Sequence, residues 1–98
     1  MNKFYVYVLE SKIYRKRYKG LTQDLDNRLK EHNSGKTKST RAFTPWSLVY
    51  YEEFSSIEEA RTREKYMKTA AGRRFLNKVL GPVDQRIPAR PDGHSGGE

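Results

Sequence analysis

Residues 3–10 (KFYVYVLE) constrain the fold more than any other stretch of the chain, because apolar side chains alternate there at the period of a β-strand. One face of the expected strand carries Tyr5, Tyr7 and Leu9, and the other carries Phe4, Val6 and Val8. Both faces are apolar enough to need cover. We therefore expect the central strand of a sheet.

Two further strands are predicted around this one. The turn over residues 11–16 and the run to Gly20 indicate a second strand that forms an antiparallel hairpin with the first. Its Arg and Lys content favours an edge position. The stretch WSLVYYEEF, residues 46–54, is rich in β-formers and predicts a third strand, in which Trp46 is more typical of a core residue than of a base-stacking platform.

Helices account for most of the remaining sequence. The first is expected over residues 23–33, with Thr22 as its cap. The second begins at an S-x-x-E capping box within residues 55–59 and continues to about residue 68. A third is expected over residues 73–80, with Gly72 weakening its start. The order β-β-α-β-α-α predicts an α+β fold, a small three-stranded, largely antiparallel sheet flanked by helices.

Length and composition bound the class of protein. A chain of 98 residues has room for one domain, which we place at residues 1–80. Residues 81–98 are rich in Pro, Gly and charge and are expected to form a disordered tail. The chain has no cysteine, and its opening residues resemble neither a signal peptide nor a membrane span. We expect a cytoplasmic protein without a membrane partner.

The basic charge is concentrated in the expected domain. The chain carries a net charge of +8, and residues 81–98 contribute −1 of it, so residues 1–80 carry +9. A compact basic domain favours a polyanion, most often nucleic acid, as partner. A solubilising basic surface is the alternative interpretation.

The first helix brings two functional side chains to one side. Arg28 and His32 are four residues apart, and the phenol of Tyr18 lies at the strand end just before Gly20 allows the chain to turn. Arg28 has the geometry to hold a phosphate with two hydrogen bonds, although a helix arginine paired with Asp24 is the more common arrangement. His32 is suited to proton relay, although a favourable cation at a helix C-terminus is the more common role.

Glu64 is the sharpest single signal in the sequence. The inward stripe of the second helix reads Ile57, Ala60, Glu64 and Met67, so that a carboxylate replaces an apolar residue. An unpaired buried carboxylate is costly, which indicates a cation partner. That partner is either a basic side chain such as Arg28 or a Mg²⁺ ion completed by waters and a substrate phosphate.

Tyrosines and a basic loop add to the candidates. Tyr7 and Tyr18 lie on paired strands, and a phenol, with an ordinary pKa near 10, acts as a base only where cations favour the phenolate. The loop residues Lys36, Lys38 and Arg41 are interleaved with Ser and Thr and suit contacts to a nucleic-acid backbone, or simply solvent.

Together these motifs resemble the GIY-YIG endonuclease family, in particular its small single-domain bacterial members, over about residues 3–78. The first family motif corresponds to Tyr5-Val6-Tyr7 and the second to Tyr18-Lys19-Gly20. Tyr5 stands where the family has Gly, and Lys19 where it has Ile. The helix with Arg28 and His32 looks like the arginine helix of the family. Glu64 matches the metal-binding glutamate, and Asn77 the polar residue late in the domain.

The resemblance implies a metal-dependent endonuclease that hydrolyses DNA with one Mg²⁺ or Mn²⁺ ion held mainly by Glu64. Tyr7 or Tyr18 would activate or position the water, Arg28 would stabilise the developing charge, and His32 would assist. A repair or recombination structure is the expected substrate, RNA is not excluded, and the protein is expected to be a monomer in solution or a dimer on DNA. Two alternatives stay open: a catalytically silent nucleic-acid-binding module of the same fold, and a protein-interaction module.

Overall fold

The structure, a computed structural model, describes residues 2–11 and 13–82. An antiparallel sheet of three strands, β1 (Phe4–Ser11), β2 (Lys16–Thr22) and β3 (Ser47–Phe54), forms its centre. The strand order is β2-β1-β3. The strand with two apolar faces therefore lies in the middle, and the basic strand lies at an edge, as the sequence predicts.

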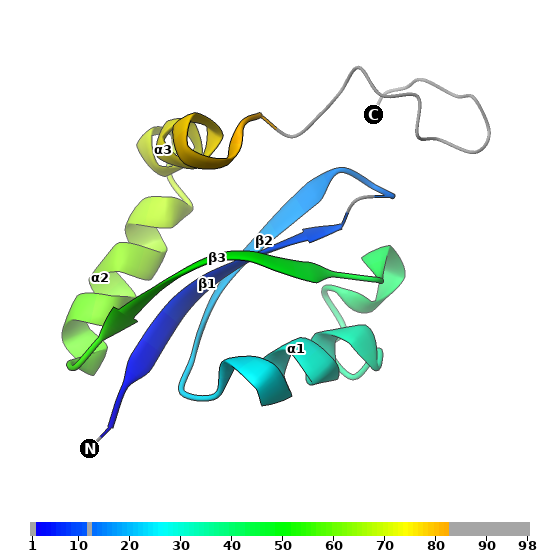
Figure 1. Cartoon of the computed structure of the whole chain (residues 1–98), viewed down its shortest axis with the longest axis horizontal. Helices are drawn as coiled ribbons and strands as arrows, with labels where there is room; N and C mark the ends of the chain where they lie inside the picture. Colours follow the sequence, from blue (N-terminus) through cyan, green and yellow to red (C-terminus); the bar gives the residue numbers. More distant parts are fainter. Residues whose placement is uncertain (1, 12, 83–98) are drawn as a thin grey trace.

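Helices cover both faces of this sheet. The helix α1 (Leu25–Asn33) lies on one side, and α2 (Ile57–Met67) and α3 (Ala70–Leu80) lie on the other (Figure 1). A short 3₁₀ helix, η1 (Arg41–Phe43), precedes β3. The predicted order of strands and helices and the α+β class are thus confirmed.

β1 contributes to a separate hydrophobic core on each face because its side chains alternate between them. On the α2 and α3 side, the fully buried core residues are Val6, Val8, Ala60, Met67 and Leu76. On the α1 side, the buried residues are Tyr7, Leu9 and Trp46, with Leu25 and Leu29 of α1 packed against them. Trp46 is 5% exposed, which confirms its assignment to the core.

The start of α1 differs from the prediction. Thr22 is still paired with Tyr5 of β1, so it ends β2 and does not cap the helix. Asp24 is the N-cap instead, and its carboxylate accepts a hydrogen bond of 3.1 Å from the amide of Asn27. The Thr22 hydroxyl accepts from the Asp24 amide, which fixes the turn between strand and helix.

α2 starts as predicted, whereas α3 starts earlier than predicted. The Ser56 hydroxyl caps α2 by accepting from the amide of Glu59. α3 begins at Ala70, three residues before the expected start, because Thr69 caps it and Gly72 sits buried in its first turn. A Cβ at Gly72 would lie 2.6 Å from Cα of Met67, so this glycine is needed where α3 approaches the end of α2.

Two predictions lie wholly or partly beyond the described residues. Residues 83–98, most of the expected disordered tail, fall outside them, and the boundary between a 1–80 domain and this tail stays a prediction. Within the part that the structure describes, no helix has the length and apolar character needed to cross a membrane.

Replacing Gly72 tests the close approach of α2 and α3. Alanine is the better helix former by about 1 kcal/mol, yet we expect Gly72→Ala to lower the free energy of unfolding by about 1–3 kcal/mol because the added methyl group has no space. Urea unfolding followed by circular dichroism measures this change. Arg74→Ala, at an exposed position of the same helix, should stay within about 0.5 kcal/mol of the parent. A Gly72→Ala protein as stable as its parent would contradict the packing described.

Candidate active site

The candidate site is built around Tyr7, at the centre of β1. Tyr7 is 2% exposed and points toward α1, and on the neighbouring strand it is paired with Gly20. A Cβ at Gly20 would lie 2.5 Å from Cζ of Tyr7, so the missing side chain gives the phenol ring its space. The glycine of the second motif is therefore required by a close approach to the tyrosine of the first.

A chain of hydrogen bonds runs from α1 through Tyr7 to the loop after α1. Arg28 Nε donates to the Tyr7 hydroxyl at 3.3 Å, and that hydroxyl lies 2.9 Å from Nε2 of His32. His32 Nδ1 lies 2.8 Å from the hydroxyl of Thr40, which in turn donates to the carbonyl of Thr37 at 3.4 Å. One arrangement of protons satisfies every contact: Tyr7 donates to Nε2, and the proton on Nδ1 is donated to Thr40.

The electrostatics agree with that arrangement. Burial, and then the charge of Arg28, lowers the pKa of His32, which is 0% exposed. Burial raises the pKa of Tyr7, and Arg28 only partly opposes this effect. Both side chains are therefore neutral near pH 7. The alternative in which His32 is a favourable cation at the helix C-terminus is disfavoured, since its ring is buried and bonded at both nitrogens.

Arg28 pairs with Glu31 rather than with either predicted carboxylate. Its Nη1 lies 2.7 Å from Oε1 of Glu31, one helical turn away. Asp24 is occupied as the cap of α1, and Glu64 pairs elsewhere. The contacts with Tyr7 and Glu31 raise the pKa of Arg28 further. The Arg28 side chain is still 34% exposed, so its guanidinium is accessible to a ligand.

Glu64 lies on α2 and is partly buried, with 24% of its side chain exposed. Its Oε2 is 3.1 Å from Nζ of Lys68, one helical turn further along the chain. The carboxylate is also close enough to Tyr7 for its charge to add to the effect of burial on the pKa of that phenol. The predicted cation partner of Glu64 thus exists within the protein, and it is Lys68, not Arg28.

Tyr18 lies beside this chain of hydrogen bonds without belonging to it. Its ring centroid is 4.9 Å from that of His32 and 6.4 Å from that of Trp46. The side chain is half-buried, and its hydroxyl forms no hydrogen bond within residues 2–11 and 13–82. The two phenols of the site therefore differ: Tyr7 has both its donor and its acceptor engaged, while Tyr18 has a free hydroxyl.

The structure does not bring Asn77 to this group. Asn77 lies near the end of α3, where its side-chain oxygen accepts from Nη1 of Arg17 at 3.1 Å. Among the described residues it forms no hydrogen bond with Tyr7, Arg28 or His32.

The basic loop is linked to the site by a residue that the sequence analysis missed. The cations of this loop are Lys36, Lys38 and Arg41, and they face solvent. Thr40, in the same loop, is 1% exposed and bonds to His32, so the loop is fixed at the site. A threonine eight residues beyond a histidine gives no local signal in the sequence. Lys68, four residues after Glu64, did give a recognisable signal, because oppositely charged side chains at this spacing pair along a helix.

The donor set suits a divalent metal only in part. Within the described residues no group of three or more His, Asp or Glu side chains is placed to hold a metal ion. Glu64 is the one carboxylate among the predicted site residues, and it offers the oxygen ligand that Mg²⁺ or Mn²⁺ prefers. It fits an ion that keeps several waters and takes its remaining oxygens from a substrate phosphate, and Lys68 would have to give up its contact for that ion to bind.

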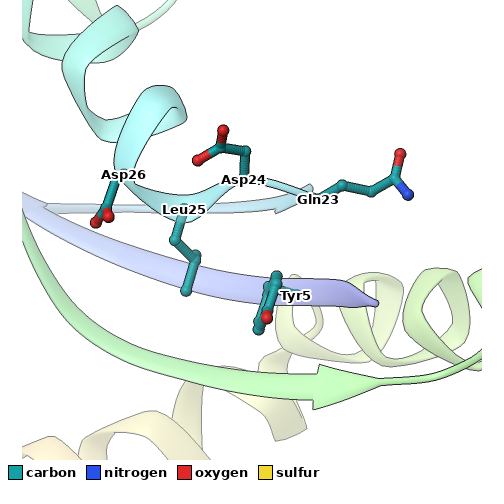
Figure 2. Close-up of a pocket in the computed structure, with 5 residues that line it drawn as sticks. All are labelled: Tyr5, Gln23, Asp24, Leu25 and Asp26. Atoms are coloured by element: carbon teal, nitrogen blue, oxygen red, sulfur yellow. The ribbon is translucent and has the colours of Figure 1, made fainter. Parts of the chain in front are cut away.

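A hollow of about 280 Å³ at the N-terminus of α1 is separate from this cluster. Its lining residues are Tyr5, Gln23, Asp24, Leu25 and Asp26, and Figure 2 shows the side chain of Leu25 reaching toward β1. None of the candidate site residues lines it. The cluster around Tyr7 and Tyr18 is thus not part of this hollow.

Comparison with known proteins identifies the family of the chain. The GIY-YIG catalytic domain model matches residues 3–78. The chain therefore belongs to the GIY-YIG family, a class of nuclease domains. Its curated relatives include a UPF0213 protein of Streptococcus pyogenes serotype M3, 48% identical over 67 residues, covering 67% of this chain and 72% of the relative. Another is a UPF0213 protein of Clostridium perfringens, 45% identical over 65 residues, covering 65% and 69%.

A solved structure is also similar. It is the solution NMR structure of the UPF0213 protein BH0048 from Bacillus halodurans, with 39% sequence identity, coverage of 81% of this chain and 86% of that chain, and a TM-score of 0.49.

The buried, neutral His32 makes stability depend on pH. Its pKa in the folded state lies below the ordinary value of 6.5, so the unfolded chain binds the proton first, and the free energy of unfolding should fall as the pH drops below about 6.5, by at most about 1.4 kcal/mol per pH unit. Urea unfolding at a series of pH values measures this slope. His32→Gln should flatten it, and His94→Gln, which removes the other histidine of the chain, should not. An equal slope in the His32→Gln protein would contradict the assignment.

Proposed function

We propose that this protein is a metal-dependent endonuclease that hydrolyses phosphodiester bonds in DNA. The observation that carries the proposal is the grouping of a free phenol, an accessible guanidinium and a partly buried carboxylate around one buried Tyr–His pair. These are Tyr18 and Arg28, which contact the pair, and Glu64, whose charge acts on Tyr7. Membership of the GIY-YIG family supports the same reaction class.

Tyr18 is the better candidate for the phenol that acts on the attacking water, either as a phenolate that takes its proton or as a hydroxyl that positions it. Its hydroxyl is free among the described residues, whereas the Tyr7 hydroxyl already donates to His32 and accepts from Arg28. Burial also keeps Tyr7 protonated. We assign Tyr7 and His32 to positioning: they hold Arg28 and pack against the ring of Tyr18.

Arg28 supplies the positive charge for the transition state. Nε is held by Tyr7 and one terminal nitrogen by Glu31, which fixes the plane of the guanidinium. The fixed group can stabilise charge on the phosphate oxygens without reorganising. A Mg²⁺ or Mn²⁺ ion bound at Glu64 would add Lewis-acid stabilisation of the leaving oxygen.

The charge distribution supports a nucleic-acid substrate. Residues 1–80 carry a net charge of +9, and the cations of the loop fixed to the site by Thr40 face solvent. Phosphate contacts position a duplex without reading its sequence. A domain of this size therefore suits recognition of a DNA structure, such as a branched or nicked repair or recombination intermediate, and RNA is the alternative substrate.

A second candidate function, nucleic-acid binding without cleavage, is favoured by one observation. Lys68 occupies the only carboxylate proposed to hold a metal, with its Nζ at 3.1 Å from Glu64. If this contact persists in the presence of divalent ions, the domain binds its partner and leaves it intact.

Cleavage assays decide between the two functions. We expect the purified chain to cut labelled flapped, nicked or four-way DNA in the presence of Mg²⁺ or Mn²⁺ and to stop when a chelator is added. Glu64→Gln and Arg28→Ala should each lower the rate at least about 100-fold, since each removes charge stabilisation that no neighbour replaces. Metal-independent binding without cleavage of any substrate would favour the second function.

The roles of the two phenols are separable. Tyr18→Phe removes only the free hydroxyl and should lower the cleavage rate by about 10²–10⁴-fold while leaving stability and DNA affinity unchanged. Tyr7→Phe breaks the contacts with Arg28 and His32, so it should lower stability as well as rate. Tyr51→Phe, at a 52% exposed position on β3, is the matched control. The assignment fails if Tyr18→Phe cuts as fast as the control.

A further inference from the structure

A group of cations gathers on the α2 and α3 side of the edge strand, away from the basic loop. In the hairpin register, Arg17 is opposite Glu10 and Lys19 is opposite Val8, so both face the helices. The charges of Arg73 on α3 and of Lys68 at the end of α2 act on Lys19 together with that of Arg17. Arg17 and Lys19 thus share the helix-facing side of β2, and the charges of Lys68 and Arg73 are near enough to act on Lys19.

The acidic side chains near these cations are too few to neutralise them. Of the five ion pairs in the part of the chain that the structure describes, one uses Glu10 for Arg17 and another uses Glu64 for Lys68. Neither Lys19 nor Arg73 belongs to any of them. Lys19 is half-buried, and burial, followed by the charges of Arg73, Arg17 and Lys68, lowers its pKa.

Hydrogen bonds fix two of these cations, Arg17 and Arg73, in place. Arg17, whose side chain is 6% exposed, donates to Glu10, to Asn77 and to the carbonyl of Gly81. Arg73 Nη1 donates to the carbonyl of Lys68 at 3.2 Å. Like charges fixed next to one another are unfavourable in the isolated protein, and an anion bound between them would remove that repulsion.

We propose that Lys19, Lys68 and Arg73 form a binding site for a backbone phosphate of the nucleic-acid substrate, one that is not itself cleaved. That the phosphate belongs to a nucleic acid rests on the proposed function. Lys68 connects the two places, because it also contacts Glu64. A nucleic-acid strand whose cleaved phosphate lies at Glu64 would therefore continue along the edge of β2 toward α3. This path is on the opposite side of the sheet from the loop of Lys36, Lys38 and Arg41.

DNA binding in the presence of a chelator tests this site without any need for cleavage. Fluorescence anisotropy of a labelled duplex, over a range of salt concentrations, gives the affinity and its salt dependence. We expect Lys19→Gln with Arg73→Gln to weaken binding about tenfold or more, and to reduce the slope of log affinity against log salt by about one for each phosphate that the variant no longer neutralises. Arg74→Gln with Lys78→Gln, which removes the same charge from exposed positions of α3, should have a much smaller effect.

A second measurement uses the unmodified protein, so it does not depend on the folding of a variant. Acetylation of lysine amines, followed by mass spectrometry, should show Lys19 and Lys68 protected when duplex DNA is added, whereas the exposed Lys30 on α1 stays reactive. Equal decreases of affinity in both double variants, or no protection of Lys19, would overturn the site.

The outcomes also separate this site from the proposed function. Weakened binding in the Lys19 and Arg73 double variant, in a protein that never cleaves, supports the phosphate site and rejects the nuclease. Active cleavage together with unchanged binding in that variant rejects the phosphate site and leaves the nuclease.

Discussion

The hydrogen bonds of the buried Tyr7 hydroxyl are the interactions on which the α1 side of the molecule depends. A phenol that is 2% exposed must have its hydrogen bonds satisfied, and Arg28 and His32 satisfy them. The second ring nitrogen of His32 then needs a partner of its own, which Thr40 supplies. Through these contacts a single side chain of β1 sets the position of α1 and of the loop that follows it. No buried side-chain polar atom in the described residues is left without a partner.

The candidate chemistry is divided between the two faces of the sheet. The arginine and both phenols belong to the face covered by α1, whereas Glu64 belongs to α2 on the other face. A three-stranded sheet permits this division because its edge is only one strand away from its centre. At Gly20 the edge strand carries no side chain, and the ring of Tyr7 occupies that space. The candidate residues therefore come from both helix layers and not from one.

Local patterns in the sequence predict most of the fold, and the errors arise where the decisive contact is not local. The alternation in residues 3–10 and the capping box at Ser56 identify β1 and the start of α2 because each depends on neighbours in the chain. The predicted start of α3 is wrong because glycine propensity carries no information about how closely two helices approach at Gly72. The candidate residues around Tyr7 are recognisable by type and spacing. Their pairings are not, since Arg28 and Glu64 each have several possible partners of opposite charge.

The edge position of β2 gives its basic residues a consequence beyond ligand binding. Within the described residues, one side of this strand has no neighbouring strand in the sheet, so its backbone amides and carbonyls are open to pairing with another chain. Lys16, which is exposed, and Lys19, which is half-buried, place positive charge near that open side, and like charges on two approaching copies repel each other. The same residues thus guard the strand against edge-to-edge aggregation. Substitutions of these lysines that changed ligand binding would therefore also change the solubility of the protein.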